Sequence, residues 1–229
     1  MKNPLRKRFF RELREEIGKY LVVFILMAAT IGFVSGFLVA DGSMLTAYNN
    51  SFQKYNIEDG KFETEEKIYK NQQEDIEKKG VTLYENFYVE KALLNGTTLR
   101  IFKNRTKVDK VCLMKGKLPE KTGEIAIDRM YADNNKLSVG DSLQSGKRKW
   151  KITGLVALSD YSALFQNNND TMFDAVKFGA AVVTEEEFSS FNQSQLVYNY
   201  AWTYTHKPKT EAQEKKKSED FMEELSKDV

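Results

Sequence analysis

One stretch of the chain differs sharply from the rest in its hydrophobic pattern. Residues 20–40 are 21 consecutive uncharged and mostly apolar positions. At about 1.5 Å per residue, a helix of this length is roughly 30 Å long, which matches the hydrocarbon core of a bilayer. A buried core helix would carry a polar face, and the apolar region of a cleaved signal peptide is usually shorter. Although Leu38–Val39–Ala40 would suit a cleavage site, the pattern predicts an uncleaved transmembrane helix.

Residues 1–19 follow a helical pattern in which apolar positions recur every four residues among Arg, Lys and Glu. The predicted apolar face consists of Leu5, Phe9, Phe10, Leu13 and Ile17. Basic amphipathic helices of this kind lie on membrane surfaces, where the basic residues meet anionic headgroups. We therefore expect a cytoplasmic surface helix that leads into the span and contacts the lipid bilayer. The alternative is a leader that serves only as a topology signal.

Charge is distributed asymmetrically around the apolar run. Seven Lys or Arg residues precede it, whereas Lys54 is the one basic residue between the run and Gly60. Cytoplasmic flanks of membrane helices are the more basic ones. The asymmetry predicts a cell-membrane protein with a cytoplasmic N-terminus and an extracellular or periplasmic location for everything after residue 40.

The rest of the chain changes repeatedly between helical and strand-like periodicity, which predicts an α+β fold. The first helix is expected to continue past the membrane to residue 55. A second helix is predicted over residues 65–79, with Thr64 as its N-cap. Asp128 is predicted to cap a short helix, and Thr184 and Glu187 have capping-box spacing for another. Strands are predicted at residues 81–94, 97–103, 110–115, 124–127, 142–144, 148–156, 178–183 and 196–204.

These elements predict a mixed α/β extracellular domain over residues 41–207. A smaller β-rich subdomain is expected as an insertion at about residues 110–160, where short strands are joined by turns that contain glycine. Trp150 and Trp202 fall in predicted strands and should be buried. Residues 208–229 are highly charged with an apolar residue at every fourth position, which predicts a charged helix. No capping residue, Gly or Pro follows, so we expect the chain to be truncated there, as the N-terminal part of a longer protein. The alternative is a natural C-terminus at which the helix frays.

Composition excludes several kinds of chemistry. The 35 Lys and Arg residues nearly balance 33 Asp and Glu residues, so the net charge gives no indication of nucleic-acid binding. One cysteine and one histidine exclude a disulfide framework, and argue against zinc sites and a Ser-His-Asp triad. Asp160, Asp170 and Asp174 lie near three asparagines at 167–169, and an acidic, amide-rich loop can bind calcium. Their spacing does not match an EF-hand, which favours a solvated loop. We therefore expect no catalytic, cofactor-binding or metal site, and no enzymatic activity.

Several short turn-forming motifs follow the span in a fixed order. They are G-K-L-P at 116–119, G-E-I-A-I at 123–127, V-G-D at 139–141 and I-T-G-L-V at 152–156. Together with the basic leader and the first membrane helix, this order resembles the start of an ABC transporter permease of the MacB/FtsX type. The positions that carry the resemblance are Gly116, Pro119, Gly123, Glu124, Gly140, Asp141 and Gly154.

The resemblance implies a MacB-like extracellular core domain in a permease dimer that works with a cytoplasmic ABC ATPase subunit. In that family, ATP-driven movement passes through the membrane helices to the exterior, which is mechanotransmission or efflux rather than bond chemistry. The family needs further membrane helices, so contact with the ATPase would run through parts of the permease outside this chain. The alternative is a stand-alone single-pass sensor or binding module. An anchored enzyme is disfavoured because no nucleophile–base arrangement is evident. The motifs do not indicate a transported substrate.

Overall fold

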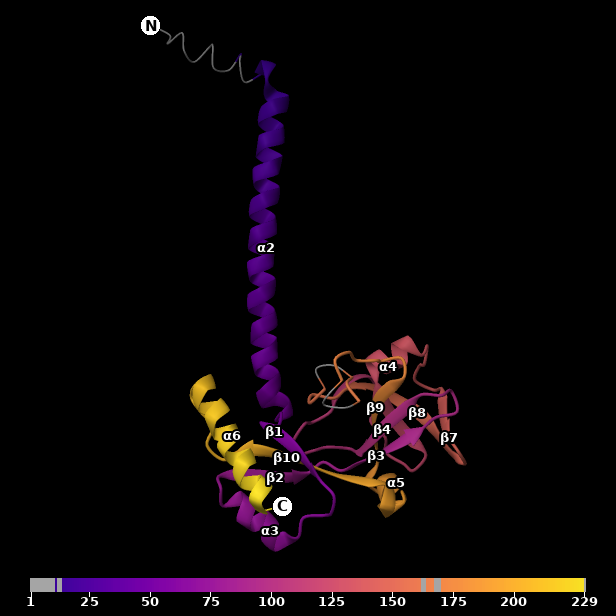
Figure 1. The fold of residues 1–229 in the computed structure, drawn as a ribbon. Coiled ribbons are helices and arrows are strands. Elements are labelled where there is room, and N and C mark those ends of the chain that lie inside the picture. The colour runs from indigo at the N-terminus through magenta and orange to yellow at the C-terminus, as the bar shows by residue number, and fades with distance from the viewer. Residues whose placement is uncertain (1–10, 12–13, 162–163, 167–169, 229) are drawn as a thin grey trace. The chain divides into compact units, whose positions relative to one another are not determined.

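A computed structural model describes residues 11, 14–161, 164–166 and 170–228 (Figure 1). The chain divides into two units, residues 1–50 and 51–229. The first contains most of α2 (Ile17–Tyr55), and the second is a mixed α/β domain built on sheets. The chain thus consists of one long apolar N-terminal helix followed by a mixed α/β domain, which confirms the predicted fold class.

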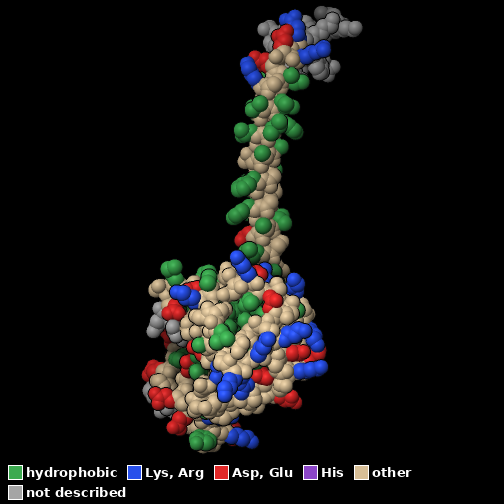
Figure 2. Space-filling view, turned by 90° about the vertical axis from the view of Figure 1, so that its right-hand side faces the viewer, with side chains coloured by type: hydrophobic (Ala, Val, Ile, Leu, Met, Phe, Trp, Pro, Cys, Tyr) green, Lys and Arg blue, Asp and Glu red, His purple; other side chains and the backbone are tan. Residues whose placement is uncertain are grey.

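The helix α2 continues beyond the apolar run and ends at Tyr55, as the sequence predicted. Every described side chain of α2 up to Asn50 is exposed, and hydrophobic side chains project from the helix along its length in Figure 2. Among the described residues, this is the one helix long and apolar enough to cross a membrane. An apolar helix without a polar face is typical of a membrane span.

Within the described residues, the second unit contains ten strands and four α-helices. The strands are β1 (Gly60–Thr64), β2 (Val81–Glu85), β3 (Tyr88–Ala92), β4 (Thr98–Lys103), β5 (Cys112–Gly116), β6 (Glu124–Asp128), β7 (Ser142–Ser145), β8 (Arg148–Ala157), β9 (Phe178–Val183) and β10 (Leu196–Tyr204). The helices are α3 (Lys70–Glu77), α4 (Arg129–Asn134), α5 (Glu185–Ser189) and α6 (Glu211–Asp228), and a 3-10 turn lies at Gln193–Gln195.

The strand β10 is shared by two groups of strands. Its first two residues pair with β3, whereas its later part pairs with β1 on one side and β2 on the other, all antiparallel. We call β1, β2, the later part of β10, α3 and α6 the small lobe. The large lobe consists of β3–β9 with α4 and α5, in the strand order β3-β4-β9-β6-β8-β5 with β7 also on β8. The pairs β4–β9 and β6–β8 are parallel.

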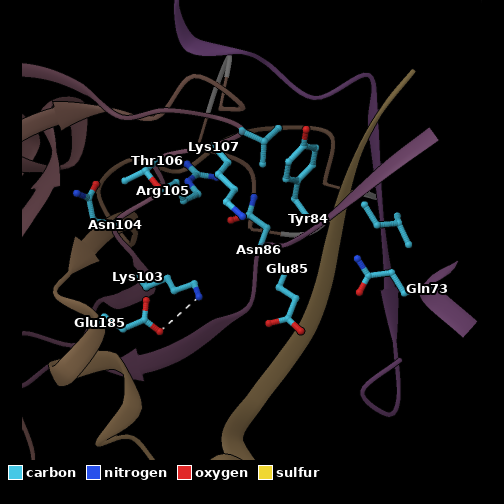
Figure 3. A pocket seen from close by; sticks show the side chains of 12 residues that line it. Gln73, Tyr84, Glu85, Asn86, Lys103, Asn104, Arg105, Thr106, Lys107 and Glu185 are labelled. Carbon is cyan, nitrogen blue, oxygen red and sulfur yellow. Dashed lines mark hydrogen bonds and ion pairs between the residues drawn. The ribbon is translucent and has the colours of Figure 1, made fainter. Parts of the chain in front are cut away.

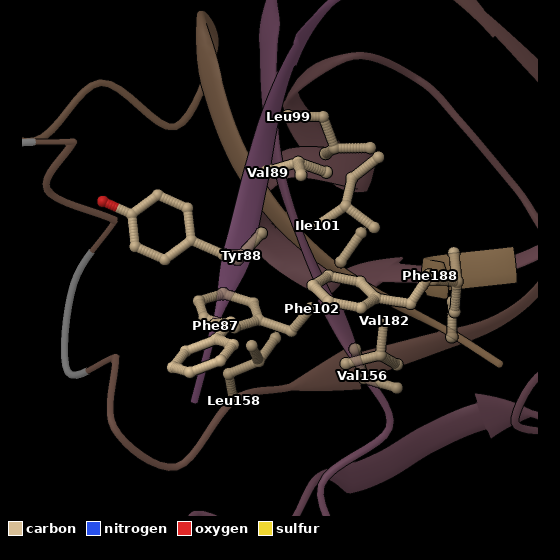
Figure 4. Close-up of a cluster of buried hydrophobic side chains, with 14 of the residues drawn as sticks. Phe87, Tyr88, Val89, Leu99, Ile101, Phe102, Val156, Leu158, Val182 and Phe188 are labelled. Atoms are coloured by element: carbon tan, nitrogen blue, oxygen red, sulfur yellow. The ribbon is translucent and has the colours of Figure 1, made fainter. Parts of the chain in front are cut away.

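The core of the large lobe forms between strands and helices that are adjacent in space rather than in sequence. Figure 4 shows Phe102 of β4, Val156 of β8 and Val182 of β9 together with Phe188 of α5. Every residue of β9 is buried because this strand lies inside the sheet. In the small lobe, Trp202 packs 4.9 Å from Phe221 of α6, measured between ring centroids. Trp150 and Trp202 are both 1% exposed, which confirms their predicted burial.

Two predicted elements are wrong in their extent. Thr64 does not cap a helix over residues 65–79, because it is the last residue of β1 and pairs with Tyr198. The helix α3 begins only at Lys70. The predicted strand over residues 81–94 is two strands, β2 and β3, which separate at Asn86 where the chain passes from the small lobe to the large lobe. Pairing with β10 explains both differences. It keeps β1 extended, and β2 and β3 are separate strands because they pair with different parts of β10.

The segment of about residues 110–160 supplies β5–β8 and α4. Its strands continue the sheet of the large lobe through the antiparallel pairing of β6 with β9. The predicted strands 178–183 and 196–204 match β9 and β10, and the charged C-terminal helix is present as α6.

Candidate functional site

The apolar face predicted for the leader lies almost entirely outside the described residues. This applies to Leu5, Phe9, Phe10 and Leu13. Ile17 is described, as the first residue of α2, and its side chain is exposed.

The glycines of two turn motifs lie opposite each other in the large lobe. Gly116 ends β5 with a φ of +77°, and Gly154 is its partner in β8. A Cβ on Gly116 would overlap the carbonyl oxygen of Thr153, and a Cβ on Gly154 would lie 2.5 Å from the carbonyl oxygen of Lys117. The two glycines therefore permit a close approach of the two backbones where β5 ends.

The next motif forms a turn closed by a carboxylate. Glu124 Oε2 accepts hydrogen bonds from the backbone N–H groups of Glu120 (2.9 Å) and Lys121 (3.2 Å). The bond from Glu120 is the main cause of a lowered pKa for this exposed carboxyl group. Pro119 is buried beside the turn, and Gly123 has a φ of +77°.

Gly140 and Asp141 form the turn that precedes β7. Asp141 Oδ2 accepts a hydrogen bond from the N–H of Ser138 at 2.8 Å, and the N–H of Gly140 donates to the carbonyl of Ile152 at 2.8 Å. The seven positions that carry the family resemblance thus shape turns and backbone contacts. None of them lines the cleft described next.

A cleft of about 350 Å³ lies where the chain passes between the two lobes (Figure 3). Its walls come from residues 83–86 at the end of β2, from residues 103–108 after β4, and from Gln73 of α3 and Glu185 of α5. Lys103 and Glu185 form an ion pair of 3.4 Å within it. Arg105 also lines the cleft, and it connects the cleft to a buried group of charges.

We call Glu58, Arg105, Asp109 and Asp160 the charge cluster. One carboxylate oxygen of each acid lies within 4.8 Å of the other two. Arg105 donates two hydrogen bonds to Asp160, from Nη2 to Oδ1 at 2.6 Å and from Nη1 to Oδ2 at 2.8 Å. The side chains of this ion pair are 5% and 3% exposed. Asp109 accepts hydrogen bonds from the backbone N–H of Glu58 (2.9 Å) and from Asn86 Nδ2 (3.3 Å).

Burial changes the pKa of two acids of the charge cluster, Glu58 and Asp109. It raises the pKa of Glu58 to about 9, and repulsion from Asp109 and Asp160 adds to the shift, whereas Lys61 at 3.8 Å opposes it. Burial also raises the pKa of Asp109, and Arg105 opposes that change. Glu58 therefore holds a proton at neutral pH when no other cation is nearby.

The raised pKa of Glu58 predicts a pH dependence of stability. The folded domain keeps a proton that the unfolded chain releases between about pH 4.5 and pH 9, so rising pH favours unfolding in this range. We expect the free energy of unfolding to fall by up to about 1.4 kcal/mol per pH unit from this group, measured by urea unfolding with a chelator present. The variant Glu58→Gln stays neutral, so its free energy of unfolding should fall less steeply with pH. An equally steep fall in the variant would refute the raised pKa of Glu58.

The end of α2 is hydrogen-bonded to the connection between β4 and β5. The hydroxyl of Tyr55 donates to Cys112 Sγ at 2.9 Å, and its carbonyl accepts from the N–H of Lys110 at 2.8 Å. The carbonyl of Asn56 accepts from the N–H of Asp109 at 3.0 Å. The residues that follow the apolar helix are therefore attached to the large lobe next to the charge cluster.

No known protein-family profile matches the chain, and no curated protein is similar enough in sequence to count as a relative. Several solved structures are partly similar in fold, among them two transporter domains. The periplasmic region of MacB from Actinobacillus actinomycetemcomitans has 11% sequence identity and a TM-score of 0.40, over 69% of this chain and 74% of that chain. The extracellular domain of the noncanonic ABC-type transporter YknZ from Gram-positive bacteria has 11% identity and a TM-score of 0.35, over 69% and 88%.

In the described part of the acidic, amide-rich segment, Asp160 and Asp174 have different partners. Asp160 turns to Arg105, whereas Asp174 Oδ1 closes a local turn by accepting hydrogen bonds from the N–H groups of Val176 and Lys177, both at 3.0 Å. Residues 167–169 lie outside the described part of the chain. The sequence analysis missed Glu58, Arg105 and Asp109, because no local spacing connects them with Asp160.

Proposed function

We propose that the chain is the membrane-anchored N-terminal part of an ABC transporter permease of the MacB/FtsX type. It couples ATP hydrolysis in the cytoplasm to movement of its extracellular domain and performs no bond chemistry of its own. The observation that carries the proposal is α2, which runs without interruption from the apolar segment to Tyr55. There it joins the large lobe through Tyr55 and Asn56. In this proposal, movement of the span reaches the exterior domain as a change in these contacts at the end of α2.

The order of the turn motifs supports the same assignment. Gly116 and Gly154 form one close backbone contact, and Glu124 and Asp141 close separate turns, so these residues build a scaffold rather than a catalytic pocket. In this proposal the N-terminus is cytoplasmic and the leader rests on the bilayer. The permease acts as a dimer, and a cytoplasmic ATPase subunit is bound by parts of the permease outside this chain.

The cleft between the lobes favours a second candidate, a stand-alone anchored sensor that binds a ligand there. The two functions differ in what ATP does to the exterior domain. Only the permease requires that nucleotide changes the contacts at the end of α2.

Cys112 tests this difference because it is half-buried and its sulfur accepts the hydrogen bond of Tyr55. In the complete permease with its ATPase, we expect a membrane-impermeant maleimide to label Cys112 from outside. ATP with vanadate should change the labelling rate severalfold, since the end of α2 moves relative to Cys112. The variant Cys112→Ser supplies the background. An unchanged rate in an active ATPase preparation would favour the sensor, and labelling only after membrane disruption would refute the orientation.

A further inference from the structure

The charge cluster contains more negative than positive charge. When ionised, Glu58, Asp109 and Asp160 carry three negative charges, and Arg105 supplies one positive charge. Lys61 approaches Glu58 at 3.8 Å, but its side chain is 36% exposed, so water screens its charge. Buried acids without compensation are strongly unfavourable. The excess of two negative charges equals the charge of one divalent cation.

Two buried oxygen atoms at the cluster provide a second, independent observation. Glu58 Oε2 and Asn86 Oδ1 accept no hydrogen bond from any described residue. The side chain of Glu58 is 9% exposed and Asn86 is 2% exposed, so bulk water does not compensate them. Asn86 reaches the cluster through its amide, which donates to Asp109 at 3.3 Å. Buried oxygens of this kind normally meet a donor, an ordered water or a cation.

We infer that Glu58, Asp109 and Asp160 form a calcium site in which Glu58 Oε2 is a ligand. All the available ligand atoms are oxygens, which suit Ca²⁺ and Mg²⁺. The number of carboxylates favours calcium. Ca²⁺ takes about six to eight oxygen ligands in flexible geometry, and each acid can offer one or two, whereas Mg²⁺ keeps several waters and is usually bound by one or two carboxylates. A half-turn of the Asn86 amide would add a neutral oxygen.

Arg105 is compatible with a bound calcium ion. Each carboxylate oxygen of Asp160 has two lone pairs, so Asp160 can accept from Arg105 and also face the ion. The three acids come from the connections α2–β1 and β4–β5 and from the segment after β8. Calcium would therefore join three segments of the second unit, whether or not the proposed transport function is correct.

The full chain in detergent micelles, stripped with a chelator, tests the site with Ca²⁺ alone. We expect one Ca²⁺ per chain by titration calorimetry, with a Kd of about 10⁻⁴–10⁻³ M as in other extracellular modules. At a hundredfold excess over Kd, the unfolding temperature should rise by about 5–10 °C. Mg²⁺ at the same concentration should raise it less, because it dehydrates reluctantly and is usually bound by only one or two carboxylates.

Matched variants separate this site from general effects of calcium. Glu58→Gln keeps the shape of the protonated acid, so it should fold without calcium and lose most of the temperature shift. Asp75→Asn removes an exposed acid of α3 that pairs with Lys78, and it should respond as the unmodified chain does. An equal shift in Glu58→Gln would overturn the proposal. So would the absence of bound calcium in the unmodified chain at about 10 mM Ca²⁺, which is ten times the weakest Kd expected.

Discussion

Replacing Arg105 with methionine should destabilise the second unit by about 3–5 kcal/mol. The guanidinium group is almost completely buried and makes both hydrogen bonds to Asp160, so its removal leaves a buried carboxylate without compensation. Methionine keeps an apolar contact with Phe102, whose ring lies 4.7 Å from the guanidinium carbon in the unmodified chain. The loss of stability should therefore come mainly from removing the positive charge of Arg105. Urea unfolding at pH 7 with a chelator present measures it.

Two further variants define the origin of that loss. Lys78→Met removes one partner of an exposed ion pair with Asp75 and should change stability far less than Arg105→Met does, because water screens that pair. The double variant Arg105→Met/Asp160→Leu removes both buried charges and should be more stable than Arg105→Met alone. If Arg105→Met were within about 1 kcal/mol of the unmodified chain, the buried pair would not support the domain.

Gly116→Ala is the second substitution with a large expected effect. The backbone of Gly116 has a φ of +77°, and the added methyl group would overlap the carbonyl oxygen of Thr153. Strain in this region of φ and overpacking each cost about 1–3 kcal/mol, so we expect a loss of about 2–6 kcal/mol. The measurement is urea unfolding, together with the fraction of chain recovered in folded form.

Gly80 provides a matched control, because its φ is +87° and no atom lies within 4 Å of the position of an added Cβ. Gly80→Ala should cost only the backbone strain, about 1–2 kcal/mol. Equal losses for the two variants would mean that the contact between β5 and β8 does not require glycine at position 116.

Sequence reasoning succeeded where a structure depends on a few neighbouring residues. Asp128 caps α4 as predicted, since its Oδ1 accepts from the N–H groups of Met130 and Tyr131. Gly96 has the positive φ, +80°, expected for the turn between β3 and β4. The charge cluster gave no such signal. Glu58 and Asp109 are 51 residues apart, and Arg105 and Asp160 are 55 apart, in a chain with 33 acidic residues.

The capping-box prediction for Thr184 and Glu187 is correct for one of its two hydrogen bonds and wrong for the other. Thr184 Oγ1 accepts from the N–H of Glu187 at 3.2 Å, as the local spacing indicates. The carboxylate of Glu187 does not return to Thr184. It accepts instead from Trp150 Nε1 at 2.8 Å and from the N–H of Gly123 at 2.9 Å. The helix start was predictable, whereas the tertiary partners that compete for the carboxylate were not.

The position of β10 has a consequence for biosynthesis. Both β1 and β2 pair with β10, and the N–H of Tyr204 donates to Asp59 across 145 residues of sequence. At 5–20 residues per second, the ribosome needs roughly 7–30 s to make that interval. During this time the edges of β1 and β2 have no partner, and contacts of such long range are slow to form. The edges of β1 and β2 are therefore open to pairing with other chains until β10 has been translated, and the small lobe can complete its sheet only after that point.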